Sequence, residues 1–199
     1  MHGLINRSIQ CFLHDTYGPD FWWGVADAAG IGRDGFETML HYDDALTEGI
    51  LRGAGDRLDK PRETLLEDLG TFLVSNPRLE ALRRLLRFGG EDFVEFLQSL
   101  DDLAGRARLA VPDLDLPDLE LLEEGPRRFR LLCRWHFPGA CHVMMGILRA
   151  LADDYGALVV LNLAGPTVGG AALDIELLDS RFSEGRDFSL AIPLDQGAA

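Results

Sequence analysis

The amino-acid sequence predicts an α+β protein, with a helical first half followed by one strand, one helix and three further strands. Two observations support this prediction. Apolar residues recur with the helical period over most of residues 1–108, whereas from Arg127 onward the period changes to two. In addition, the strands surround a single helix rather than alternating with several, which argues against repeating βα units and favours an antiparallel sheet.

Three helices are expected in the first sixty residues. The first ends at the Tyr-Gly-Pro sequence of residues 17–19, where glycine and proline interrupt the pattern. Asp20 is expected to cap the second helix, and Asp43 or Asp44 the third. Their apolar faces consist of Ile5, Ile9, Phe12 and Leu13 in the first helix, Phe21, Trp22 and Val25 in the second, and Leu46, Ile50 and Leu51 in the third.

Three more helices are expected before residue 110. Pro61 suits the first turn of the fourth helix, and the glycine pair at residues 89–90 closes the fifth. The sixth is expected to run unbroken from about Glu91 to Arg108. Its inward stripe should consist of Phe93, Phe96, Leu97, Leu100 and Ala104. Ala104 is therefore expected to face the interior.

The second half begins after an acidic, proline-containing connector at residues 113–126. Residues 127–137 alternate in polarity, which is typical of a half-buried strand. Its inward face should consist of Phe129, Leu131, Cys133, Trp135 and Phe137. A nearly apolar helix follows from about residue 139 to residue 155. Strands over residues 157–165, 170–179 and 186–195 close the chain, and the first two form a hairpin.

The charge balance and the cysteine content narrow the class of protein. The net charge of −14 disfavours binding to nucleic acid or to an anionic membrane surface, because both repel an acidic protein. No apolar run approaches the roughly 20 residues that a membrane-spanning helix needs. Cys11, Cys133 and Cys141 are an odd, sparse set rather than a disulfide framework. Without a recognisable signal peptide, these features predict a cytoplasmic protein.

One cluster of four side chains could suggest a zinc site. Cys133, His136, Cys141 and His142 lie within ten residues, and zinc needs four converging ligands. In the expected strand, however, Cys133 and His136 point to opposite faces because their separation is odd. We therefore expect two buried thiols and two surface histidines, with no metal bound.

Two other possible functional patterns carry little weight. "GIGRDG" at residues 30–35 matches the dinucleotide-binding fingerprint in its letters, but that motif needs a strand before it. Here a helix precedes it, so an interhelical turn is expected. No serine, cysteine or histidine stands in an arrangement that marks a nucleophile, and the sequence does not indicate an enzyme.

Several short stretches together resemble one family. They are "MHGLIN" at the start, "TYGPDFW" at residues 16–22, "YDD" at 42–44 and above all "FLQSLDDL" at 96–103. They are similar to the haem-nitric oxide/oxygen-binding (H-NOX, HNOB) domain, the N-terminal sensor domain of soluble guanylate cyclase that also occurs as stand-alone bacterial proteins. The resemblance implies a helical distal subdomain at 1–60, an α+β proximal subdomain at 61–194 and a tail at 195–199. In the family, the two subdomains enclose a haem.

The same resemblance identifies two positions where this sequence departs from the family. The family holds the iron through one histidine on the helix after "FLQ-x-L-D-x-L", and that position is Ala104 here. A Tyr-x-Ser-x-Arg signature binds the haem propionates, and the matching positions hold Cys133, Trp135 and Phe137. The resemblance implies a ligand pocket lined by Leu4, Ile5, Leu100, Ala104, Pro117, Cys133, Trp135, Phe137, Val143 and Met144.

These features predict a sensory domain in which the standard haem ligation is lost. We expect either no cofactor or an unknown apolar ligand in the pocket, and no metal. The resemblance further implies a signalling partner, such as a histidine kinase or a cyclic-nucleotide enzyme. The alternative is a haem-binding nitric oxide sensor that uses a non-standard iron ligand.

Overall fold

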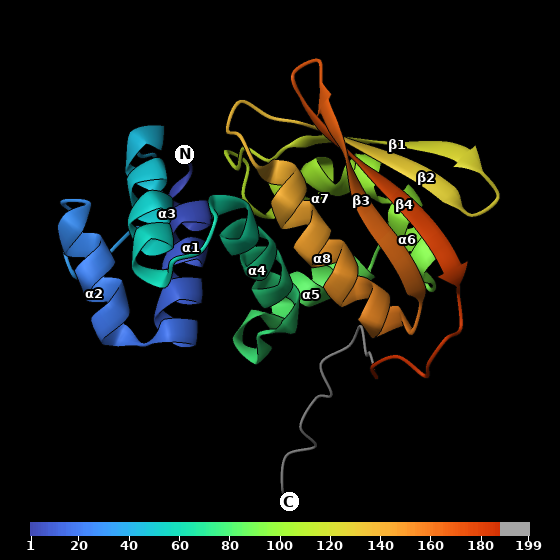
Figure 1. Ribbon diagram of the computed structural model, residues 1–199, viewed down its shortest axis with the longest axis horizontal. Coiled ribbons are helices and arrows are strands. Elements are labelled where there is room, and N and C mark those ends of the chain that lie inside the picture. The colour runs from blue at the N-terminus through green and yellow to red at the C-terminus, as the bar shows by residue number, and fades with distance from the viewer. Residues whose placement is uncertain (188–199) are drawn as a thin grey trace, which may run out of the picture.

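The computed structural model describes residues 1–187 and confirms the α+β fold class. Figure 1 shows the helices within residues 3–58 on one side, the sheet on the other, and the helices of residues 62–75 and 140–155 between them. The α-helices are α1 (Gly3–Tyr17), α2 (Pro19–Ala28), α3 (Asp44–Leu58), α4 (Arg62–Ser75), α5 (Glu80–Arg87), α6 (Phe93–Gln98), α7 (Leu103–Ala110) and α8 (Ala140–Tyr155). The strands are β1 (Asp118–Gly125), β2 (Arg128–Arg134), β3 (Leu158–Thr167) and β4 (Gly170–Asp179), and two 3₁₀ turns are η1 (Pro77–Leu79) and η2 (Leu100–Asp102).

The four strands form one antiparallel sheet in the order β1-β2-β4-β3. The sequence analysis missed β1, which lies inside the acidic connector. Leu119 of β1 pairs with Cys133 of β2 and is buried, whereas Asp118 on the opposite face is exposed. β1 is thus an ordinary half-buried strand whose acidic residues face solvent. The expected β3–β4 hairpin is confirmed, and residues 188–195 of the expected last strand lie outside the described part of the chain.

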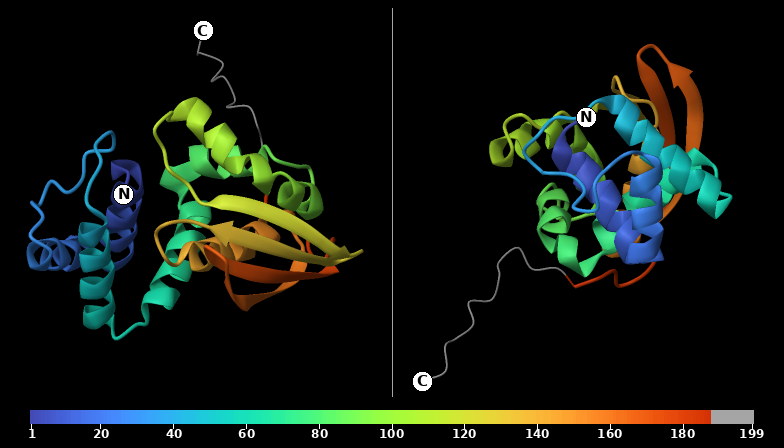
Figure 2. Two further views of the ribbon diagram at one scale, coloured as in Figure 1. Left: turned by 90° about the horizontal axis from the view of Figure 1, so that it is seen from above. Right: turned by 90° about the vertical axis from the view of Figure 1, so that its left-hand side faces the viewer.

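The apolar residues are divided between two clusters. The distal cluster joins α1, α2 and α3 to one face of α4, through Leu65, Leu66 and Leu69. The sheet-side cluster lies between the sheet, α6 and α8. Seen from above, the helices of the distal cluster stand apart from the sheet, and α4 leads from one group to the other (Figure 2). Within residues 1–187, no helix is long and apolar enough to cross a membrane.

α4 and α8 connect the two clusters through close backbone packing. A Cβ atom at Gly70 of α4 would collide with the carbonyl oxygen of Val143. A Cβ atom at Gly146 of α8 would collide in the same way with the carbonyl oxygen of Glu67. Glycine is therefore required on both helices, because no side chain can be placed between them.

The expected sixth helix is wrong as a single element, since it is broken into α6, η2 and α7. A 3₁₀ turn advances about 120° per residue, against about 100° in an α-helix. The inward stripe is therefore displaced after Leu100. Ala104 is partly exposed on α7, and Ala107 takes the buried position instead. The prediction that Ala104 faces the interior is thus only partly met.

Several helix starts also differ from expectation. Gly18, with a φ of 92°, is the N-cap of α2, so Asp20 lies within the first turn. Asp43 is the N-cap of α3, and its carboxylate accepts a hydrogen bond from the Ala45 amide at 2.9 Å. Pro61 immediately precedes α4 rather than lying in its first turn. The "GIGRDG" stretch lies in the loop between α2 and α3, as expected.

Candidate functional site

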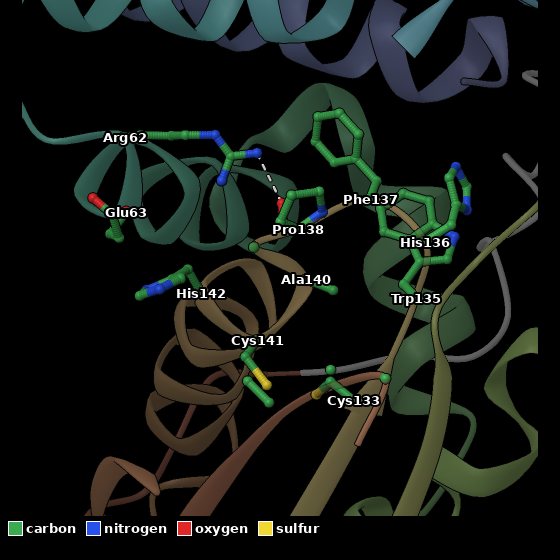
Figure 3. A pocket seen from close by; sticks show the side chains of 14 residues that line it. Arg62, Glu63, Cys133, Trp135, His136, Phe137, Pro138, Ala140, Cys141 and His142 are labelled. Atoms are coloured by element: carbon green, nitrogen blue, oxygen red, sulfur yellow. Dashed lines mark hydrogen bonds between the residues drawn. The ribbon is translucent and has the colours of Figure 1, made fainter. Parts of the chain in front are cut away.

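A cavity of about 420 Å³ lies where α4, the end of β2 and the start of α8 meet (Figure 3). Its lining comes from four places in the chain: the start of α4, the end of β2 with the loop that follows it, the first turn of α8, and the β3–β4 turn with the start of β4. The lining residues are Arg62, Glu63, Cys133, Trp135, His136, Phe137, Pro138, Gly139, Ala140, Cys141, His142, Gly169, Gly170 and Ala171.

The loop of residues 135–139 forms the wall of the cavity that faces the distal cluster. β2 ends at Arg134, so Trp135 and Phe137 belong to the loop and not to the strand, in contrast to the sequence prediction. Phe137 remains buried, as expected, but it packs in the distal cluster. Gly139 has a φ of 101°, which favours glycine, and it lets α8 begin directly against α4.

Arg62 connects three elements at the rim of the cavity. Its guanidinium donates hydrogen bonds to the Glu48 carboxylate of α3, at 3.2 and 2.8 Å. It also donates to the Pro138 carbonyl oxygen at 2.8 Å, the bond drawn in Figure 3. Its guanidinium carbon lies 5.3 Å from the centre of the Phe137 ring, within the range of a cation–π contact. The side chain therefore fixes the loop against α3 and α4.

His136 forms a second polar link between the loop and its surroundings. Its Nε2 lies 3.2 Å from Asp44 of α3, and its Nδ1 lies 3.2 Å from Asp115 of the connector. Trp135 donates its indole N–H to the same Asp115 carboxylate at 3.0 Å. A hydrogen bond from the amino group of Met1 lowers the pKa of Asp44, with the charges of Met1 and His136 as further causes.

Two of the side chains that line the cavity are thiols, and they face each other. Cys133 of β2 and Cys141 of α8 are both buried, as expected, and their sulfur atoms lie on the facing sides of the two elements (Figure 3). The hydrogen bond between the thiols raises the pKa of Cys133, and burial raises it further. The same hydrogen bond lowers the pKa of Cys141.

The ten residues of the expected pocket are distributed over several places. Cys133, Trp135 and Phe137 line the cavity. Leu100 and Met144 are buried in the sheet-side cluster, while Ile5 and Val143 are partly buried against the distal cluster. Leu4, Ala104 and Pro117 are partly exposed on α1, α7 and the connector.

The sequence analysis did not identify Arg62 as part of the site. Arg62 lies 76 residues from Pro138, and no local pattern links these two positions. His142 was expected at the surface, yet it is only partly exposed and its Nδ1 lies 3.5 Å from Glu67. Across residues 1–187, no three His, Cys, Asp or Glu side chains converge closely enough to hold a metal ion.

Comparison with known proteins gives one consistent result. A family model described as haem-NO-binding matches residues 2–162. A soluble guanylate cyclase of Caenorhabditis elegans, gcy-31, is 25% identical over 82% of this chain and 23% of its own length. Soluble guanylate cyclase 89Da of Drosophila melanogaster is 23% identical over 90% of this chain and 27% of its own length. This chain thus spans about a quarter of these curated relatives.

Solved structures show the same fold. An H-NOX protein from S. oneidensis in the Fe(II)NO ligation state superposes with a TM-score of 0.75 and 17% identity, covering 90% of this chain and all of that one. An unliganded Fe(II) H-NOX protein from K. algicida gives a TM-score of 0.74 and 16% identity, covering 95% of this chain and all of that one. At these identities, the likeness establishes the architecture.

Proposed function

This chain belongs to the haem-NO-binding family, and from that membership we propose that it is a sensory domain that works without histidine-ligated haem. In this proposal the domain is a regulator that is either haem-free or occupied by another, apolar ligand. It transmits its state through a partner protein. The observation that carries the proposal is Ala104, which stands where the family resemblance requires the iron-binding histidine.

The local structure around Ala104 supports this proposal. Ala104 lies on the short helix α7, after the 3₁₀ turn η2, and is partly exposed. The five histidines are His2, His14, His41, His136 and His142, all of which lie on other elements. Two of these, His136 and His142, line the cavity, and each has a carboxylate beside its ring. A methyl group at position 104 offers iron no lone pair.

The residues at the positions of the propionate-binding signature also do not suit haem. Cys133, Trp135 and Phe137 replace the tyrosine, serine and arginine of the family signature, so one cation and two hydroxyl groups are missing. The cations nearest to the loop are already paired, Arg62 with Glu48 and Arg134 with Asp118 and Glu120. Burying a carboxylate without a partner costs several kcal/mol. The residues present therefore do not fit a haem held in the family manner.

The family relationship supports the proposal of a partner protein. The curated relatives are soluble guanylate cyclases, and this chain corresponds to about a quarter of their length. We therefore propose a cyclic-nucleotide enzyme or a histidine kinase as the partner.

Visible absorption of the purified protein tests the haem-free proposal. The protein would be produced with haem supplied, and we expect no stoichiometric Soret band. A stoichiometric band that shifts on addition of nitric oxide would contradict the proposal and support a haem-based sensor with a non-standard ligand. If no band is present, native mass spectrometry of the same sample distinguishes an empty domain from one that carries a small apolar molecule.

The Ala104→His variant sharpens this test. We expect that a histidine at this position alone confers no haem binding, because Trp135 and Phe137 still occupy the signature positions and Phe137 is buried. The measurement is again the Soret band, at equal haem and protein concentrations. A five-coordinate haem in the single variant would show that residues 135 and 137 do not block the site.

A further inference from the structure

Cys133 and Cys141 are placed as a reactive pair. Each side chain lies in the sheet-side cluster, yet both also line the cavity. The wall of the cavity includes His136, Pro138 and Gly169, which are exposed, so the cavity is connected to the surface. A small uncharged molecule can therefore reach two thiols that the protein interior otherwise shields.

The two thiols are not equivalent. Cys141 lies in the first turn of α8, a helix of 16 residues, where the positive end of the helix dipole favours a thiolate. Cys133 lies in the strand β2 and faces Cys141 (Figure 3), and this neighbouring thiol, together with burial, raises the pKa of Cys133. Cys11 is a useful reference within the same chain, since it lies on α1, partly exposed, and burial raises its pKa.

We propose that Cys133 and Cys141 form an oxidation site, at which a peroxide converts the two facing thiols into a disulfide between β2 and α8. The geometry assigns Cys141 as the attacking thiol and Cys133 as the resolving thiol. The disulfide would join the two ends of the loop of residues 135–139, which contacts the distal cluster. This inference deepens the proposed function, because it names a chemical input for the same cavity.

The chemistry balances with hydrogen peroxide as the oxidant. The Cys141 thiolate attacks one peroxide oxygen, a sulfur–oxygen bond forms, the oxygen–oxygen bond breaks, and the released hydroxide takes up a proton to become water. Cys133 sulfur then attacks the sulfenic sulfur of Cys141. The sulfur–sulfur bond forms as the sulfur–oxygen bond breaks, and the departing hydroxide takes the proton of Cys133 to give a second water. Two thiols are oxidised and one peroxide is reduced.

The disulfide would restrain the link between the two clusters. Phe137 of the loop is buried in the distal cluster, and His136 and Pro138 contact Asp44 and Arg62. Fixing both ends of the loop to each other limits how far these contacts can move relative to α8. Oxidation at the cavity therefore acts on the same loop that carries the distal contacts.

Intact mass spectrometry with thiol labelling tests the inference. The reduced protein is freed of reductant, treated with hydrogen peroxide and quenched. Its remaining thiols are then alkylated, first in the folded protein and a second time after unfolding. After oxidation we expect one alkylated cysteine instead of three, and a polypeptide lighter by the mass of two hydrogen atoms. Peptide mapping should then find residues 133 and 141 in one disulfide-linked fragment. Three alkylated cysteines after treatment would overturn the inference.

Single-cysteine variants test the assignment of roles. In Cys133→Ser, we expect Cys141 to accumulate as sulfenic acid, which a dimedone probe labels. In Cys141→Ser, we expect Cys133 to remain largely unlabelled, and Cys11→Ser should form the disulfide as the unaltered chain does. Equal dimedone labelling of Cys141 in Cys133→Ser and of Cys133 in Cys141→Ser would contradict the assigned attacking and resolving roles. Loss of the disulfide in Cys11→Ser would contradict the pairing of Cys133 with Cys141.

This test is independent of the haem measurement. A Soret band would remove the haem-free proposal, but it would leave the count of alkylated cysteines unchanged. Conversely, if the protein bound no haem and its thiols resisted peroxide, the proposed function would stand and the oxidation site would be refuted. Co-purification of a soft metal ion on the two thiols, with no disulfide formed after its removal, would also overturn the inference.

Discussion

The distal cluster and the sheet-side cluster meet at two contacts that are built differently. The glycine contact, formed by Gly70 of α4 and Gly146 of α8, brings two helix backbones together without side chains between them. The loop contact, formed by residues 135–139, uses the Phe137 ring and charged groups from α3, α4 and the connector. The glycine contact is made by backbone atoms, which do not titrate, whereas the loop contact includes the titratable side chains of Asp44, Asp115 and His136. Under the proposed sensory role, regulation would act through the loop contact.

Removing the aromatic anchor of the loop contact should have the largest effect. Phe137→Ala leaves a cavity in the distal cluster, and such truncations cost about 3–5 kcal/mol of unfolding free energy. Urea denaturation followed by circular dichroism measures this loss. The matched control is Phe88→Ala, because Phe88 is 67% exposed and should contribute less than about 0.5 kcal/mol. A loss below about 1 kcal/mol in Phe137→Ala would show that the loop is not anchored in the cluster.

The glycine contact should be nearly as sensitive. Gly70→Ala places a methyl group against the carbonyl oxygen of Val143, and overpacking of this kind costs about 1–3 kcal/mol. The control is Gly105→Ala on α7, where a Cβ atom meets open space. That substitution should stabilise the helix by up to about 1 kcal/mol, as alanine does relative to glycine. If both variants had the same stability, the close approach of α4 and α8 would be refuted.

The polar part of the loop contact should contribute less. Arg62→Gln removes the ion pair to Glu48 and the hydrogen bond to the Pro138 carbonyl. Both partners are partly exposed, so solvent screening limits the expected loss to about 1 kcal/mol. Arg52→Gln, at an exposed position of α3, serves as the control and should change stability by less than about 0.5 kcal/mol. If the Arg62→Gln and Arg52→Gln variants had the same denaturation midpoint, Arg62 would contribute no more to stability than an exposed surface charge.

The smallest expected effect is a pH dependence at Asp44. Its pKa is lowered in the folded protein by the hydrogen bond from the Met1 amino group, so ionised Asp44 stabilises the fold above the unfolded-state pKa of about 4. This stabilisation is lost as the pH falls through the lowered pKa. Because Asp44 is 40% exposed, we expect Asp44→Asn to cost about 0.5 kcal/mol at pH 7. If the difference in stability between Asp44→Asn and the unaltered protein persisted unchanged below pH 4, the charge of Asp44 would not be its cause.

Much of the fold could be predicted from the sequence, because local interactions decide it. The cap of α3 and the apolar face of α1 need only a few neighbouring residues. Of the two predicted caps, Asp43 takes the position, and of the predicted apolar face Ile9, Phe12 and Leu13 are buried while Ile5 is partly buried. The inward positions Phe129, Leu131 and Cys133 of β2 follow from the alternation of one strand. β1 was missed because its charged residues made the segment resemble a connector, although Leu119 and Leu121 alternate with Asp118 and Glu120.

The break of α6 and α7 at η2 was decided by tertiary packing. Asp101 accepts a hydrogen bond from the Leu121 amide of β1 at 2.8 Å, so this turn is attached to the edge of the sheet. No signal within residues 91–108 shows that contact. As a result, the sequence identified Ala104 as a departure from the family but misjudged how deeply it is buried.

The sequence by itself thus determined the α+β class, the resemblance to the family and the substitutions at residues 104, 133, 135 and 137, but it missed β1 and the break at η2. Only the tertiary structure decided which residues share the cavity. Cys133 and Cys141 lie on different elements, and Arg62 reaches the loop from 76 positions away. The physical reason is that helix caps and strand alternation depend on neighbours in the chain. A cavity, in contrast, depends on how separate elements pack, and here two glycines set that packing by letting α4 and α8 touch.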